Sequence, residues 1–269
     1  MPAQLFDTHC HLTFGDLRPQ CERVIADAVR AGVSRMITVA VRTDELEAAL
    51  AVRKINSGVR VSAGIHPHEA SGASEEDLGR LARFWREPGV AAAGEMGLDY
   101  HYDFSPREVQ QSVFRRQLDL AAEVGLPVVV HCREAQEEAV RILLGHGYGG
   151  KPVVFHCFSG SAEEAAELRA HGWWTSFTGM ITFKNAGPVR RACAETPADQ
   201  LMFETDAPYL SPEPVRGIRP NEPQYLAHTV RFAAALRGQS FESLAEATTA
   251  NAVRFFRLSD TRCPGCVTF

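Results

Sequence analysis

Several kinds of segment are missing from this sequence of 269 residues, and each absence excludes a class of protein. No apolar run approaches the roughly 20 residues that a membrane-spanning helix needs. The first residues, MPAQLFDTHCH, lack a basic stretch followed by an apolar one, so we expect no signal peptide and a cytoplasmic protein. No G-x-G-x-x-G follows the first strand-like segment and no G-x-x-x-x-G-K-[ST] occurs, which leaves the usual nucleotide-binding folds without support.

Lysine and paired cysteines are also scarce. The only lysines are Lys54, Lys151 and Lys184, and the formal net charge is −5. We therefore expect no global basic field for tight binding of duplex nucleic acid, although an enzyme could hold a few nucleotides locally. The seven cysteines have no disulfide-framework spacing, which favours a reducing compartment. Cys263 and Cys266 have no partner pair for a zinc cluster, so residues 259–269 are interpreted as a frayed tail.

What the sequence does contain is a regular alternation of short apolar segments and longer amphipathic ones. Strands are predicted at 5–9, 35–40, 59–65, 90–95, 127–131, 153–156, 173–178 and 201–204. Helical patterns lie between them, and two more follow the last strand at 222–236 and 241–256. This alternation predicts a parallel sheet closed into a single TIM-type (β/α)8 barrel over residues 1–258, with a doubly wound open sheet as the alternative.

Side chains that can bind a metal follow the predicted strands. The carboxyl ends of the strands, where a barrel carries its chemistry, bear His9, His11, His66, Glu95, His131, His156, Glu204 and Asp206. One histidine at such an end is usually a hydrogen-bonded structural residue. A set drawn from several strands is hard to explain as core filling, because each buried polar group needs its own partner. The pattern therefore predicts a convergent metal site.

The number of ligands indicates how many ions the site holds. One tetrahedral zinc takes four ligands, fewer than the four imidazoles and two carboxylates available here. These belong to His9, His11, His131, His156, Glu95 and Asp206. They suit two divalent cations with a bridging carboxylate and open positions for water and substrate. Glu95 is a better bridge than a carbamylated lysine, given where the three lysines fall. Histidine ligands favour zinc or manganese and oxygen ligands favour magnesium, so all three metals stay open.

These stretches together resemble the TatD family of metal-dependent hydrolases, within the amidohydrolase-like barrels. The matching motifs run in order through residues 6–256: FDTHCHL, GIHPH, GEMGLDYHYD, HCREA, FHCFSGS, ETDAPYLSP, NEP and TTANAVRFF. The resemblance implies a TIM-type barrel that hydrolyses phosphodiester bonds, mostly in DNA, while some relatives act on aminoacyl-tRNA esters. It also implies a first metal site of His9, His11, Glu95 and Asp206, and a second of Glu95, His131 and His156.

The carboxylates after the last strand are candidates for catalysis. Asp206 is a ligand and lies where it could take a proton from the attacking water. Glu204 is two residues earlier and so on the same face. We interpret Glu204 as a partner that holds a histidine tautomer, with a further acid or base as the alternative. Asp99, just past Glu95, is expected to support loop geometry.

Three residues are candidates for binding the substrate. Arg133 and Lys184 could clamp a phosphate, and His66 could line the pocket near the leaving group. Arg133 could instead form a surface ion pair with Glu134 or Glu137, and His66 could be a structural histidine.

Three functions fit this set of residues. The first is a two-metal deoxyribonuclease that acts on single-stranded ends, since the chain lacks a large basic surface. The second is an ester or amide hydrolase, such as an aminoacyl-tRNA deacylase, with the same metal centre. The third is an inactive barrel that only binds, against which the full ligand set argues. We expect a monomer that holds a nucleic-acid or nucleotide substrate weakly, without a membrane or an obligate protein partner.

Overall fold

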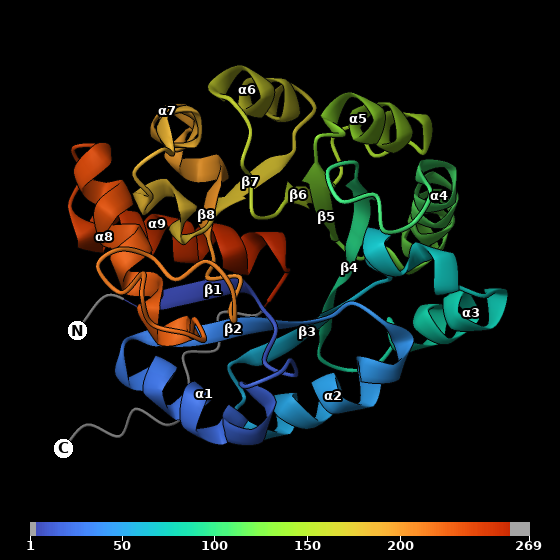
Figure 1. Ribbon diagram of the computed structural model, residues 1–269, viewed down its shortest axis with the longest axis horizontal. Helices are drawn as coiled ribbons and strands as arrows, with labels where there is room; N and C mark the ends of the chain where they lie inside the picture. Colours follow the sequence, from blue (N-terminus) through green and yellow to red (C-terminus); the bar gives the residue numbers. More distant parts are fainter. Residues whose placement is uncertain (1–3, 259–269) are drawn as a thin grey trace.

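The computed structural model describes residues 4–258, so the predicted tail with Cys263 and Cys266 lies outside the described residues. One parallel sheet of eight strands follows chain order: β1 (Leu5–Cys10), β2 (Val33–Ala40), β3 (Val59–Ala63), β4 (Val90–Asp99), β5 (Val128–Arg133), β6 (Val153–Phe155), β7 (Trp174–Phe177) and β8 (Leu201–Phe203). The segment after β8 bridges back to β1 at Cys10 and Ala207 (Figure 1). The predicted (β/α)8 barrel is therefore confirmed.

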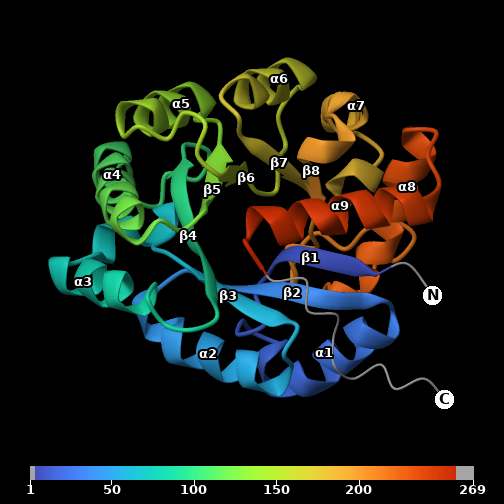
Figure 2. The same cartoon turned by 180° about the vertical axis from the view of Figure 1, so that it is seen from behind.

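Helices ring the barrel on its outer side, as Figure 1 shows. They are α1 (Cys21–Arg30), α2 (Leu46–Ile55), α3 (Glu75–Phe84), α4 (Arg107–Val124), α5 (Gln136–Gly145), α6 (Ala162–Ala170), α7 (Gly187–Glu195) and α8 (Leu226–Leu236). A further helix, α9 (Phe241–Phe255), lies across one end of the barrel instead (Figure 2). Ser74 and Ser161 begin α3 and α6 with capping boxes, and Gly125 ends α4 in the left-handed conformation. Among the described residues, no helix has the length and apolarity needed to cross a membrane.

Short 3-10 helices occur in the connections: η1 (Arg18–Gln20), η2 (Thr43–Glu45), η3 (Pro67–Gly72), η4 (Gly179–Thr182), η5 (Ala198–Gln200) and η6 (Pro223–Tyr225). Most of the predicted strand ends agree with the structure to within two residues. The main exception is β4, which we expected to end at Glu95 and which continues to Asp99. Its pairing with β5 persists beyond Glu95, from Met96 to Asp99, and this pairing explains the extra length.

The interior of the barrel is apolar at its amino end. Phe6, Val129, Val154 and Met202 are buried there, in a core separate from the one beneath the surrounding helices. Helix α9 lies across this end of the sheet, as the view from behind shows (Figure 2). The Phe255 and Phe256 rings close it, because the Phe256 ring lies 5.8 Å from that of Phe6. The strands therefore leave only their carboxyl end open to carry a site.

Candidate metal centre

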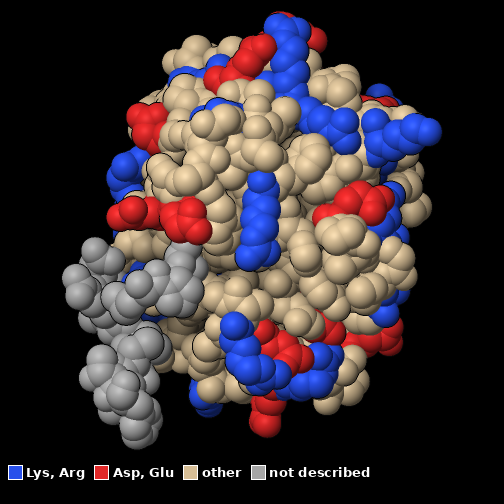
Figure 3. Space-filling view, turned by 90° about the vertical axis from the view of Figure 1, so that its left-hand side faces the viewer, with Lys and Arg blue, Asp and Glu red and all other residues tan. Residues whose placement is uncertain are grey.

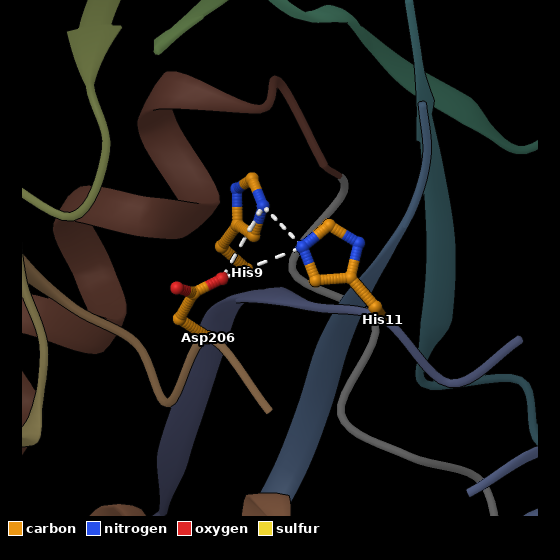
Figure 4. Close-up of side chains that lie close together, drawn as sticks. All are labelled: His9, His11 and Asp206. Carbon is orange, nitrogen blue, oxygen red and sulfur yellow. Dashed lines mark hydrogen bonds and ion pairs between the residues drawn. The ribbon is translucent and has the colours of Figure 1, made fainter. Parts of the chain in front are cut away.

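The first group of ligands comes from β1 and from the segment after β8. His9 lies in β1, His11 follows it, and both rings point toward Asp206 (Figure 4). The Nε2 atoms of the two histidines are 3.3 Å apart, and Asp206 Oδ1 lies 3.4 Å from His11 Nε2. All three side chains are largely buried. The structure thus brings these three predicted site residues together.

Asp7 holds these two segments against each other. Its carboxylate accepts hydrogen bonds from the backbone N–H and the hydroxyl of Thr205, at 2.9 and 2.5 Å, and from the backbone N–H of His9. Burial raises the pKa of Asp7 to about 7. Asp206 follows directly with a φ of 54°, in the left-handed region that aspartate tolerates better than most residues. Asp7 and this backbone turn together direct Asp206 toward the β1 histidines.

Glu95 lies between two groups of imidazoles and presents one oxygen to each. Its Oε2 lies 3.3 Å from His9 Nε2. Its Oε1 lies 2.7 Å from His156 Nε2, 2.9 Å from His131 Nδ1 and 3.3 Å from His66 Nε2. Burial alone would raise the pKa of Glu95, but the surrounding imidazoles, with His156 first, hold that pKa well below its usual range. The carboxylate is therefore ionised at the centre of the cluster.

An irregularity in β4 aims Glu95 at the mouth. Ala93 of β4 pairs with Val128 of β5, and the next pair joins Met96 to Val130. Between these pairs β4 therefore has one residue more than β5, and Glu95 lies in the resulting bulge. Gly94 and Gly97 flank it with φ values of 131° and 144°. A Cβ at Gly94 would collide with the carbonyl oxygen of Val129 on β5, so glycine is required at this close approach. The G-E-M-G motif thus has a local structural cause.

Two buried carboxylates contact the far nitrogens of the β5 and β6 histidines. Glu204 Oε1 lies 3.4 Å from His156 Nδ1 and also accepts the backbone N–H of Cys157. Asp99 Oδ2 lies 2.9 Å from His131 Nε2. Burial alone would raise the pKa of Asp99, but its hydrogen bonds, with His131 first, lower that pKa. Glu204 and Asp99 therefore touch the cluster through histidines rather than facing its centre.

From the sequence alone we assign no role to His68 and only support of the loop to Asp99. Asp99 does support the loop, since its Oδ1 accepts the backbone N–H of His101 and of Tyr102 at 3.1 and 2.9 Å. In addition, its Oδ2 lies 3.0 Å from His68 Nε2. The available signals were the second histidine of GIHPH and the polar residue four positions after Glu95. Neither signal shows that these residues and His131 meet, because that contact depends on the closure of the barrel.

The three predicted substrate-binding residues lie in different surroundings. His66 is buried against Glu95, and its burial lowers its pKa to about 4, so its ring is neutral. Arg133 ends β5 with its guanidinium 4.8 Å from the Tyr102 ring centre, and forms no ion pair with any residue in the range 4–258. Lys184 is exposed two residues after η4, and no contact within that range joins it to the cluster.

The donor atoms fit divalent cations. Three groups place their ligand atoms within 4.8 Å of one another: His9, His11 and Asp206; His9, Glu95 and His156; and His66, Glu95 and His131. Imidazole nitrogens and carboxylate oxygens that face one buried space at such distances form a suitable ligand set for Zn²⁺ or Mn²⁺. The groups share Glu95 and His9, so neighbouring ion positions would have ligands in common.

Comparisons with known proteins agree with this geometry. The model of the family described as TatD related DNase matches residues 6–257. The chain is 40% identical over 255 residues to the uncharacterized metal-dependent hydrolase YabD of Bacillus subtilis, covering 95% of this chain and all of that protein. It is 39% identical over 259 residues to the 3'-5' ssDNA/RNA exonuclease TatD of Erwinia tasmaniensis, covering 94% of this chain and all of that protein.

A solved structure shows the same relationship. The TatD homologue YjjV of Escherichia coli superposes with a TM-score of 0.90 and 30% identity, over 96% of this chain and 100% of that one. Family model, relatives and fold therefore lead to one assignment. The chain belongs to the TatD related DNase family and is a metal-dependent hydrolase of ester bonds.

Proposed function

We propose that the protein is a two-metal phosphodiesterase that removes nucleotides from the ends of single-stranded DNA. The observation that carries this proposal is the position of Glu95, whose Oε2 faces His9 while its Oε1 faces His156 and His131. A carboxylate that divides its oxygens between two groups of ligands suits two-metal hydrolysis. The names of relatives such as the Erwinia exonuclease support the choice of nucleic acid as substrate.

We assign the ligands in two sets. His9, His11, Glu95 and Asp206 would hold one ion, and Glu95, His131 and His156 would hold the other, with His66 close enough to Glu95 to join the second set. When bound, the two cations polarise the phosphoryl oxygen and acidify the attacking water. All of these side chains come from one chain, so the ligand set is complete without a second copy.

Asp206 is the residue we assign to accept the proton of the attacking water. Its side chain is 13% exposed, compared with 4% for Glu95 and 1% for Glu204, so it is the most accessible of the three carboxylates. Glu204 is held by His156 and by the backbone N–H of Cys157. We therefore assign Glu204 to the orientation of His156 and not to proton transfer.

Charge supports a weakly held, single-stranded substrate. On the face shown in Figure 3, basic and acidic side chains are interspersed, and no continuous basic stripe crosses it. The net charge of −5 adds no general attraction for a phosphate backbone. Arg133 and Lys184 are the cationic groups we assign to phosphate contacts. With so few contacts the salt dependence is shallow, since each contributes only about −0.7 to the slope for single strands.

The test is turnover on end-labelled single-stranded and double-stranded oligonucleotides, with a covalently closed circle as control, at several salt concentrations. We expect single strands to be shortened from an end faster than duplexes are, and the closed circle to stay intact. Rapid internal cutting of the circle would contradict end-directed action. If the protein loaded with manganese, magnesium or zinc cuts no DNA or RNA but releases amino acids from aminoacyl-tRNA, it is a deacylase and the nuclease proposal is wrong.

A further inference from the structure

Two exposed aromatic rings lie in the loop between β4 and α4, at the carboxyl end of the barrel. Phe104 is 67% exposed and Tyr102 is 48% exposed. Their ring centres are 5.3 Å apart and their planes differ by 18°, so the two rings stack on each other. Single exposed apolar residues need no explanation, but a stacked pair of exposed rings beside a catalytic mouth offers aromatic surface to a ligand. Phe104 is the more open of the two, because the Arg133 guanidinium lies over the Tyr102 ring.

The loop is fixed at both ends. On one side, Asp99 accepts the backbone N–H groups of His101 and Tyr102. On the other, the Ser105 hydroxyl donates to the carbonyl oxygen of His68 and accepts the backbone N–H of Ser71, both at 3.0 Å. A binding surface on such a loop is already ordered before the ligand arrives, so binding costs little conformational entropy.

The rings connect to the candidate metal centre through His68 and Asp99. The Phe104 ring lies 4.7 Å from the ring of His68, in an edge-to-face arrangement. His68 shares the Asp99 carboxylate with His131, and His131 contacts Glu95. A group stacked on these rings would therefore lie near a phosphate bound at the mouth.

The distribution of charge favours a nucleotide at this place. The Arg133 guanidinium lies over the Tyr102 ring without an ion-pair partner in the described part of the chain, so it can contact a phosphate beside the stacked group. The nearby carboxylate of Asp103 is paired with Arg107 at 2.8 Å. By contrast, the cavity of about 270 Å³ between the loops after β5 and β6 is lined by Glu134, Glu137 and Glu164, whose charges would repel a phosphate backbone.

We propose that Tyr102 and Phe104 form a stacking platform for one base of a single-stranded nucleic acid, next to the phosphodiester that is cut, with Arg133 on the adjoining phosphate. This proposal rests on the proposed nuclease function. Every base has an aromatic face, so such a platform binds any sequence and requires that the base be unpaired. The platform would therefore select single strands without a basic groove.

The experiment measures binding and cleavage with pairs of single-stranded oligonucleotides that differ only near the 3' end, where one member has an abasic tetrahydrofuran in place of a nucleotide. Binding to the metal-loaded, full-length protein is followed by fluorescence anisotropy, with phosphorothioate linkages that resist hydrolysis. We expect the wild-type protein to bind the complete strand roughly 10-fold more tightly than the abasic strand. In Phe104→Ala this ratio should fall toward one, whereas Phe104→Trp should keep it. Leu236→Ala serves as the control, because Leu236 is a 38% exposed apolar residue at the far end of α8.

The two readouts separate the two proposals. An unchanged ratio in both Phe104→Ala and Tyr102→Ala would overturn the platform, whatever the cleavage assay shows. Loss of the ratio in Tyr209→Ala, on the segment after β8, would place the base on the other side of the mouth and would also overturn it. If the wild-type protein discriminates in binding but cleaves no nucleic acid, the platform stands and the nuclease function fails.

Discussion

The two ends of the barrel are built from the same strands and have opposite character. At the amino end, Phe6 of β1 and Val129 of β5 pack in an apolar interior that α9 closes with Phe255. At the carboxyl end, three residues further along β1, His9 lies in a buried cluster of imidazoles and carboxylates. A strand can thus supply core packing at one end and metal ligands at the other, because side chains near its two ends have different neighbours.

The two ends also differ in what burial contributes to free energy. Apolar side chains at the closed end gain from leaving water. Ionisable groups at the open end lose hydration, and only compensating partners make their burial tolerable. Bound cations would be such partners for His9, His11 and Glu95, whose donor atoms converge. Substitutions at the open end should therefore remove activity, while those at the closed end should remove stability.

The largest effect is expected from the residue at the centre of the open end. Glu95→Ala removes the carboxylate that faces both groups of ligands, so hydrolysis should become undetectable and the metal content should fall below two ions per chain. Elemental analysis and turnover on single-stranded DNA measure both quantities. Glu246→Ala, at an exposed position of α9, is the matched control and should change neither. Full metal occupancy in Glu95→Ala would exclude the bridge.

A smaller but specific loss is expected for Asp206→Asn. The amide keeps an oxygen of similar size near His11 but is a poor acceptor for the proton of the attacking water. Turnover should fall by roughly 10²- to 10⁴-fold while most of the metal remains bound. If the variant binds both ions and turns over near the wild-type rate, the proton goes elsewhere, and Glu204→Gln would be the next variant to measure.

At the closed end, Phe255→Ala should act on stability alone. The ring, at the last residue of α9, is buried with its centre 5.9 Å from the Trp174 ring of β7. Its removal leaves a cavity that should lower the free energy of unfolding by roughly 3–5 kcal/mol. Urea denaturation measures this change. Turnover per folded molecule should stay at the wild-type value, and a large loss of turnover in fully folded protein would contradict the division of roles between the two ends.

Removal of the metal should lower stability by an amount that depends on the free metal concentration. Each ion that binds only the folded chain adds about 2.7 kcal/mol when its free concentration is 100 times the dissociation constant, and less at lower concentrations. A chelator should therefore abolish turnover and lower the midpoint of thermal unfolding, and returning Mn²⁺ or Zn²⁺ should restore both. In Glu95→Ala the chelator should shift the midpoint less. An equal shift in both proteins would mean that the stabilising ions bind outside the mouth.

Much of the barrel could be predicted because strand and helix periodicities are local. The predicted ligands lie together for a related reason: histidines directly after apolar segments, such as His131 and His156, must lie at one end of a parallel barrel. Helix α9 was predicted as a helix, but its amphipathic pattern does not indicate which surface it covers. Its position across the amino end depends on contacts between Phe256 and Phe6, which are far apart in the chain.

The remaining features depend on contacts between strands that no single segment contains. The bulge that aims Glu95 results from its pairing with β5, and the same pairing extends β4 to Asp99. His66 reaches Glu95 only once β3 and β4 lie side by side. Lys184 follows β7, as the sequence predicted. It is nevertheless exposed after η4, and within residues 4–258 no contact joins it to the cluster.

We propose that the open end of the barrel holds two ions that share Glu95. Anomalous scattering from crystals loaded with Mn²⁺ tests it most directly, because each bound ion gives its own peak. We predict two peaks at the carboxyl end of the barrel, one beside His11 and Asp206 and one beside His131 and His156, with the Glu95 carboxylate between them. A single peak, or peaks that Glu95 does not contact, would contradict the account.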